Sequence, residues 1–273
     1  MRRKDGPAPL TAVLCDGIVC DGFIWKYLWD DLSRSVSVAH WHYRGHGRSA
    51  APADPERIGV VDHAADLDAV RHHLGDPEVV LCGHSFGTQV VFEAWRQRRE
   101  RVRAMILCCG SWGRITHTFK GSEMLATTLP ALLEAASKHP RIARALWSRM
   151  PPKLAVRIAM LTGEVDPHTV AAEDMEPYFR HVAHVDFPMF LRMLEAAGEH
   201  SAQDLLPSID VPVLVIHGDR DSFTPPSVAE QMQKLLPKAE LVMIPGGTHV
   251  ALLEHHELVA LHVEKFLGRL GVA

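Results

Sequence analysis

Short apolar runs alternate with segments of helical periodicity along the first 113 residues of the chain. The apolar runs predict buried strands at residues 11–15, 35–41, 79–82 and 104–108. Between these runs, apolar residues recur at helical spacing in residues 23–32, 62–74 and 88–95. Alternation of strands and helices is typical of a parallel sheet that is covered by helices on both faces.

The alternation stops after residue 113. From about Arg114 to Leu206 the chain shows no convincing strand, only helix-like segments that are interrupted by prolines. Asp166-Pro167 and Phe187-Pro188 have the pattern of helix starts, with each proline in a first turn. We therefore predict a helical insertion at residues 114–206.

The pattern of strands and helices resumes near the C-terminus. Two more strands are predicted at 213–217 and 239–244, and two more helices at 226–235 and 257–270. The predicted organisation is one α/β core, formed by residues 1–113 and 207–273, with the insertion 114–206 as a helical cap.

Residues Gly83-His84-Ser85-Phe86-Gly87 join the strand at 79–82 to the following helix. A Gly-x-Ser-x-Gly sequence between a strand and a helix is typical of a nucleophile elbow, which exposes the serine hydroxyl beside a helix N-terminus. The unpaired N–H groups of that terminus favour developing negative charge. The pentapeptide alone is equally compatible with a structural turn.

A serine nucleophile needs a base and an acid that orients the base. In an open parallel sheet both lie in loops at the carboxyl ends of strands. The loop after strand 213–217 contains Asp219 and Asp221, and the loop after strand 239–244 contains His249. The chain order Ser, Asp, His is that of nucleophile-elbow enzymes.

The chain resembles the α/β-hydrolase fold superfamily over about residues 11–270. The matching motifs are RGHGRS at 44–49, GHSFG at 83–87, HGDRDSFTPP at 217–226 and GGTHVALLEH at 246–255. The resemblance implies a mostly parallel sheet flanked by helices, with Ser85, Asp221 and His249 as the catalytic triad and Asp219 as a less favoured acid. We expect His46 and His84, in the glycine loops, to support the site without transferring protons.

The resemblance also implies an oxyanion hole formed by the backbone N–H groups of Ile18 and Phe86. Members of the superfamily usually have His-Gly where this chain has Asp16-Gly17. A carboxylate that pointed toward the hole would oppose the developing charge. We expect Asp16 instead to turn into its loop and accept backbone N–H groups. The short N-terminus further predicts that the leading antiparallel hairpin is absent and the sheet smaller than usual.

The proposed reaction is acyl transfer from Ser85 to water. Trp25, Trp112, Phe187 and Phe190 are candidates for an apolar substrate pocket, and each is as readily explained as packing between insertion and core. The histidine pairs do not favour a shared metal, and we expect no metal and no cofactor.

Composition indicates which partners and which compartment to expect. The net charge of −4 and the pI near 6.5 predict no strong attraction to nucleic acid or anionic membranes. The basic start of the chain is followed by Asp5-Gly6-Pro7 rather than an apolar segment, and no apolar run reaches the length of a membrane span. Five cysteines in mostly apolar surroundings are typical of core residues in a reducing compartment. The chain is thus expected to be cytoplasmic.

The leading hypothesis is a serine hydrolase acting on a carboxylic ester, lactone or thioester. A C–C bond hydrolase, a cofactor-free perhydrolase and an acyltransferase are alternatives on the same fold. Epoxide hydrolases and haloalkane dehalogenases need an aspartate at position 85, so Ser85 argues against them. A ligand-binding member without catalysis is the alternative from a different class.

Overall fold

The computed structural model describes residues 1–147, 149 and 151–271. Within these residues, seven strands form one sheet in the order β1-β3-β2-β4-β5-β6-β7. The strands are β1 (Arg2–Lys4), β2 (Ala8–Cys15), β3 (Val36–His40), β4 (Glu78–His84), β5 (Val102–Cys108), β6 (Val213–Gly218) and β7 (Ala239–Ile244). Strands β2 to β7 run parallel, and β1 pairs antiparallel with β3. The predicted parallel sheet is therefore confirmed.

Helices cover both faces of the sheet because alternate strand residues point to opposite sides. Leu81 packs in one cluster with side chains of α2 (Val60–His73), α3 (Phe86–Gln97) and α10 (Pro226–Leu235). Its neighbour Val80 packs in the other cluster with side chains of α1 (Leu28–Ser33) and α12 (His256–Arg269). Both clusters are buried, which explains why the strands are continuous apolar runs.

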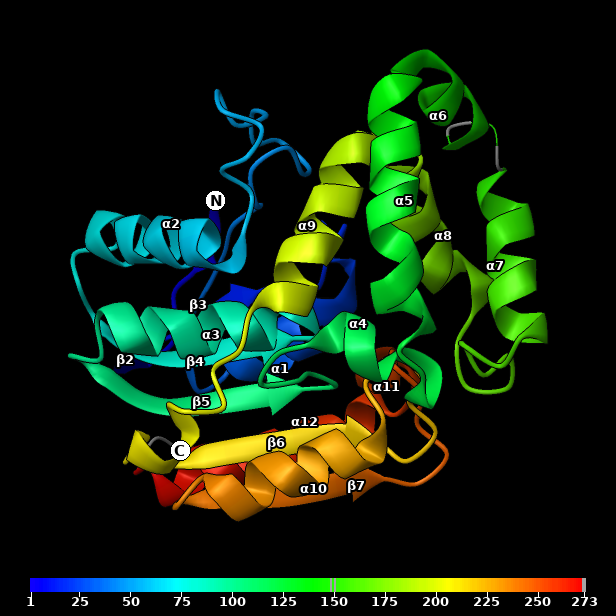
Figure 1. Cartoon of the computed structure of the whole chain (residues 1–273). Helices are drawn as coiled ribbons and strands as arrows, with labels where there is room; N and C mark the ends of the chain where they lie inside the picture. Colours follow the sequence, from blue (N-terminus) through cyan, green and yellow to red (C-terminus); the bar gives the residue numbers. More distant parts are fainter. Residues whose placement is uncertain (148, 150, 272–273) are drawn as a thin grey trace.

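The segment between β5 and β6 is helical, as predicted. It contains α4 (Ile115–Thr118), η2 (Phe119–Gly121), α5 (Met124–Lys138), α6 (Pro140–Trp147), α7 (Pro152–Leu161), α8 (Ala172–Val182), α9 (Phe187–Glu199) and η3 (Leu206–Ser208). Figure 1 shows α5 to α9 gathered at one end of the sheet, in green to yellow-green. Residues 114–206 are called the insertion below; their status as a separate cap domain stays a prediction.

Some local predictions were wrong. A leading antiparallel strand does form, as the three residues of β1, although it pairs with β3 and is not part of the hairpin whose absence was predicted. Residues 23–32 form a 3₁₀ turn, η1 (Phe23–Trp25), followed by the short α1. Asp166 does not begin a helix: residues 167–169 form a turn, in which Asp166 Oδ1 accepts the N–H of His168 at 2.8 Å. Asp186, by contrast, caps α9 by accepting the N–H of Met189 at 3.1 Å.

None of the helices in the described part of the chain combines the length and the apolar character that a membrane span requires. All five cysteines are buried and none is in a disulfide. Cys15, Cys82 and Cys108 lie on the strands β2, β4 and β5, which confirms them as core residues.

Three buried histidines make the fold sensitive to acid. Burial lowers the pKa of His46 and His84 to about 4 and that of His63 to about 3. In the unfolded chain a histidine has a pKa of about 6.5. Because the folded pKa values are depressed, the stability that these side chains contribute is complete above about pH 6.5. It is lost as the pH falls from there toward 4, since only the unfolded chain takes up the three protons.

We expect these histidines to lower the free energy of unfolding by up to about 4 kcal/mol per pH unit between about pH 6 and 4. Urea denaturation at pH 8, 7, 6 and 5 measures the effect. His63→Leu, which fills a similar volume without titrating, should reduce the slope of the unfolding free energy with pH by the contribution of one proton. A denaturation midpoint that stays constant from pH 7 to pH 5 would contradict this account.

Candidate active site

Ser85 lies at the sharp turn between β4 and α3. Its backbone has φ 54° and ψ −120°, a region that residues with a side chain rarely adopt. The Ser85 N–H donates to the carbonyl of Cys108 at 3.0 Å, and its carbonyl accepts the N–H of Thr88 at 3.0 Å. A Cβ on Gly87 would lie 2.2 Å from the carbonyl oxygen of Cys15, so only glycine allows α3 to begin this close to β2. The turn has the geometry of a nucleophile elbow.

The structure brings Ser85, His249 and Asp221 together in one hydrogen-bonded row. The Oγ of Ser85 lies 2.9 Å from Nε2 of His249, and Nδ1 of His249 lies 2.9 Å from Oδ2 of Asp221. With a neutral imidazole, the serine hydroxyl donates to Nε2 while Nδ1–H donates to the carboxylate. This is the arrangement in which a histidine can remove the serine proton.

Asp221 is buried and held by its own loop. Its Oδ1 accepts the N–H groups of Phe223 and Thr224 at 2.9 and 3.0 Å, and its Oδ2 accepts the hydroxyl of Thr224 at 2.8 Å. Burial acts to raise the pKa of Asp221, but His249, His217 and these donors outweigh it and the pKa is lowered. Asp219 is exposed, accepts the N–H of Gly246 at 2.8 Å, and has no hydrogen bond to His249 among the described residues. The geometry thus favours Asp221 over Asp219 as the acid.

Three further side chains, His84, Phe223 and Glu254, contact His249 or its neighbour Thr248. His84 Nε2–H donates to the carbonyl of His249 at 3.0 Å, in agreement with the supporting role expected for it. Burial lowers the pKa of His84 to about 4, so it is neutral at pH 7. Phe223 stacks on the His249 ring with centroids 4.8 Å apart. Glu254 accepts the N–H of Thr248 at 2.6 Å.

The roles of Phe223 and Glu254 were not predicted from the sequence. Phe223 is one apolar residue in a loop, and Glu254 lies five residues beyond His249 in a helix, α11 (Ala251–Glu254). Glu254 also accepts the N–H of Asp166 at 2.9 Å, which connects the His249 loop to the insertion. No spacing rule relates these residues, so only the fold brings them together.

Asp16 departs from the expectation in one respect. Asp16 does not line the cavity at Ser85, and its carboxylate accepts side-chain donors rather than the expected backbone N–H groups. Trp25 Nε1–H donates to Oδ1 at 2.7 Å, and Nε2 of His40 lies 2.8 Å from Oδ2. Within the described residues, the backbone N–H groups of Ile18 and Phe86 donate no hydrogen bond. Both are therefore available to an oxyanion, as the resemblance implies.

An apolar cavity of about 710 Å³ opens onto Ser85 and His249. Most of its wall comes from the insertion, including Phe187 and Phe190 as predicted. Trp25 and Trp112 are not among its lining residues, so these two predictions are corrected. Trp25 is fully buried, where its N–H donates to Asp16, and Trp112 is partly buried and packs against the core.

The comparison with known families agrees with this geometry. The profile of the serine aminopeptidase S33 family matches residues 13–256, which is most of the chain. The chain belongs to this family. The sequence motifs predicted membership of the α/β-hydrolase superfamily and did not indicate a family within it; the prediction of the superfamily is confirmed.

Relatives of this S33 member include several enzymes. A pimeloyl-[acyl-carrier protein] methyl ester esterase of Neisseria meningitidis is 36% identical over 248 residues, covering 89% of this chain and 88% of that protein. A putative non-heme chloroperoxidase of Synechocystis is 43% identical over 261 residues, covering 94% and 90%. The polyketide synthase ThaQ of Burkholderia thailandensis is 29% identical over 98% of this chain, which spans only 12% of that protein.

A solved structure shows the same fold. The thermophilic esterase from Thermogutta terrifontis superimposes with a TM-score of 0.77 at 22% identity, covering 98% of this chain and 92% of the esterase. The S33 member therefore has the α/β-hydrolase fold.

Proposed function

We propose that this chain is a serine hydrolase that cleaves carboxylic esters, or the related lactones and thioesters, through an acyl-enzyme on Ser85. The observation that carries the proposal is the hydrogen-bonded row from Ser85 through His249 to buried Asp221, at the wall of an apolar cavity. The esterases among the relatives and the solved structures support the same class of reaction.

The proposed mechanism follows from the roles of these groups. His249 takes the proton of Ser85 as its oxygen attacks the ester carbonyl, and Asp221 stabilises the imidazolium that forms. The N–H groups of Ile18 and Phe86 hold the carbonyl oxygen as it becomes negative. His249 then protonates the leaving alcohol. Water, deprotonated by His249, attacks the acyl-enzyme, and the carboxylic acid leaves as Ser85 regains its proton.

The cavity favours an apolar acyl group. Its wall includes leucine and phenylalanine side chains of the insertion, such as Leu129, Phe187 and Phe190. Glu164 also lies at this wall, but it is paired with Lys120 and accepts the hydroxyl of Ser222 at 2.5 Å. Among the described residues that line the cavity, a charged acyl group would find no unpaired cationic side chain. Each methylene of an apolar acyl group that is buried there contributes about 0.8 kcal/mol to binding.

We expect kcat/KM for p-nitrophenyl esters to rise by up to about fourfold per added methylene until the cavity is filled. Steady-state rates for a series from acetate to dodecanoate measure this. Leu129→Trp places a larger side chain in the cavity and should therefore shift the preferred acyl length to shorter chains. Leu154→Trp, at an exposed leucine outside the lining, should not. A wild type that neither hydrolyses any of these esters nor reacts with a fluorophosphonate would refute the proposed class of reaction.

An acyl chain attached to a carrier protein is a second candidate substrate. Two relatives, the Neisseria esterase and the polyketide synthase, have names that refer to carrier-bound or polyketide chemistry. Residues 135–163 of this chain contain six lysines and arginines and no aspartate or glutamate, although the whole chain has a net charge of −4. A carrier-bound substrate predicts low kcat/KM at every length of the p-nitrophenyl series.

The other reactions known on this fold predict different substrates. A perhydrolase would turn over with peroxide, an acyltransferase with an added alcohol, and a C–C bond hydrolase with a diketone.

A further inference from the structure

The loop of residues 16–22 runs beside the elbow in a strained conformation. The N–H of Cys20 donates to the carbonyl of Gly17 at 3.3 Å and closes a tight turn. Within this turn Val19 has φ 52°, in the left-handed region that strongly disfavours a β-branched residue. Such strain persists only where the surrounding structure holds it in place.

Gly17 brings this turn against the elbow. A Cβ added to Gly17 would lie 2.9 Å from Nδ1 of His84 and 3.3 Å from Cβ of Ser85. The next residue, Ile18, borders the apolar cavity together with Ser85. A shift of about 1 Å in the turn would therefore move the Ile18 N–H out of reach of an oxygen bonded to the carbonyl carbon at Ser85.

Asp16 anchors the turn at its first residue. Its carboxylate receives Trp25 Nε1–H at 2.7 Å and lies 2.8 Å from Nε2 of His40, and its carbonyl accepts the hydroxyl of Tyr43 at 2.9 Å. These partners come from η1, from β3 and from the loop that follows β3. Asp16, Trp25 and Tyr43 are fully buried, and His40 is 2% exposed. Asp16 and its three partners thus form a buried hydrogen-bond network.

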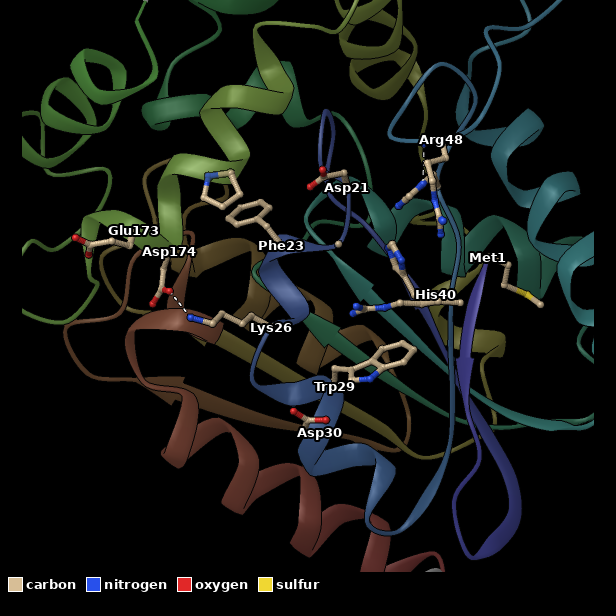
Figure 2. A pocket seen from close by; sticks show the side chains of 14 residues that line it. Met1, Asp21, Phe23, Lys26, Trp29, Asp30, His40, Arg48, Glu173 and Asp174 are labelled. Carbon is tan, nitrogen blue, oxygen red and sulfur yellow. Dashed lines mark hydrogen bonds and ion pairs between the residues drawn. The ribbon is translucent and has the colours of Figure 1, made fainter.

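The anchor also keeps the negative charge of Asp16 away from the reacting atoms. Neither Asp16 nor His40 lines the apolar cavity. His40 instead lines a second cavity of about 540 Å³, which Figure 2 shows together with Asp21, Trp29 and the ion pair of Lys26 with Asp174. The network therefore lies behind the turn that carries Ile18.

We propose, on the basis of the function proposed above, that Asp16 and its side-chain donors His40 and Trp25 are positioning residues for the oxyanion hole. They hold the strained turn so that the Ile18 N–H is in place before the reaction begins. Preorganised donors of this kind stabilise the transition state more than the bound substrate, so their loss lowers kcat rather than raising KM.

The decisive comparison is His40→Gln with His40→Leu. Glutamine can still donate an N–H to Oδ2 of Asp16, whereas leucine has a similar volume and no donor. For p-nitrophenyl ester hydrolysis, His40→Leu and Asp16→Ala should lower kcat by about 10- to 100-fold with KM changed by less than about threefold. His40→Gln should retain kcat within about threefold. Affinity for an alkyl boronic acid, which forms a tetrahedral adduct with the serine, should fall by the same factor as kcat.

Ser37→Ala is the matched control on the same strand. It removes the bond from the Gly6 N–H to Ser37 Oγ, 3.2 Å long, and should lower stability without changing kcat. If the leucine or alanine variant does not fold, Trp25→Phe removes one donor and keeps an aromatic ring. An unchanged kcat in the folded variants would overturn the positioning role alone. A wild type without turnover would overturn the proposed function as well.

Discussion

Replacement of Ser85 by alanine is expected to lower kcat for ester hydrolysis by about 10⁵-fold or more. The variant lacks the oxygen that forms the acyl-enzyme, and only binding and the oxyanion donors remain to assist water. KM should change little, because the hydroxyl contributes little surface to the apolar cavity. Steady-state assays at high enzyme concentration measure the residual rate.

Ser85→Gly is the matched control for strain. Ser85→Ala keeps the Cβ and therefore the strain of the turn at φ 54°, whereas glycine tolerates this region. Both variants should be inactive, and Ser85→Gly should be more stable than Ser85→Ala by about 1 kcal/mol. Hydrolysis in Ser85→Ala within tenfold of the wild type would mean that another nucleophile performs the reaction.

Asp221→Asn is expected to lower kcat by about 10³- to 10⁴-fold. The carboxylate accepts Nδ1–H of His249 and so leaves Nε2 free to receive the proton of Ser85. An asparagine amide can donate to Nδ1, which favours the tautomer with its proton on Nε2, facing the serine. The variant should fold, because asparagine still accepts the loop donors Phe223 N–H and Thr224 N–H. Assays of kcat above pH 7 measure the loss.

Asp219→Asn separates the two aspartates of the loop. Asp219 is exposed and accepts only the Gly246 N–H among the described groups, so its variant should retain kcat within about threefold. A larger loss in Asp219→Asn than in Asp221→Asn would reverse the assignment of the acid.

The parallel sheet was predictable because its inner strands, β3 to β6 and most of β2, are buried on both faces. Such strands, for example Val79 to Cys82, appear as continuous apolar runs, and their alternation with segments of helical periodicity indicated that they are strands. The strand β1 was missed for the opposite reason. Arg2, Arg3 and Lys4 are polar and exposed, and they join the sheet through backbone hydrogen bonds to β3 alone. No side-chain pattern records a strand of this kind.

The candidate triad was predictable because each member occupies a loop at the carboxyl end of a strand and belongs to a recognisable motif. The partners of Asp16 were not, since Trp25 and His40 come from separate elements that only the fold brings together. Trp25 was a candidate pocket residue, with packing as an equal alternative, because its sequence position near the oxyanion loop is compatible with both roles. Which rings face the cavity depends on how α9 packs, and its apolar periodicity alone does not determine that.

The most direct test of the account is to map the site of a covalent fluorophosphonate adduct by peptide mass spectrometry. Because Ser85 is activated by His249 and the adduct oxygen occupies the oxyanion hole, we predict stoichiometric labelling of the peptide that contains Ser85. Labelling should be lost in Ser85→Ala and strongly slowed in Asp221→Asn. A wild type that remains unlabelled, or that is labelled at a different residue, would contradict the assignment of Ser85 as the nucleophile.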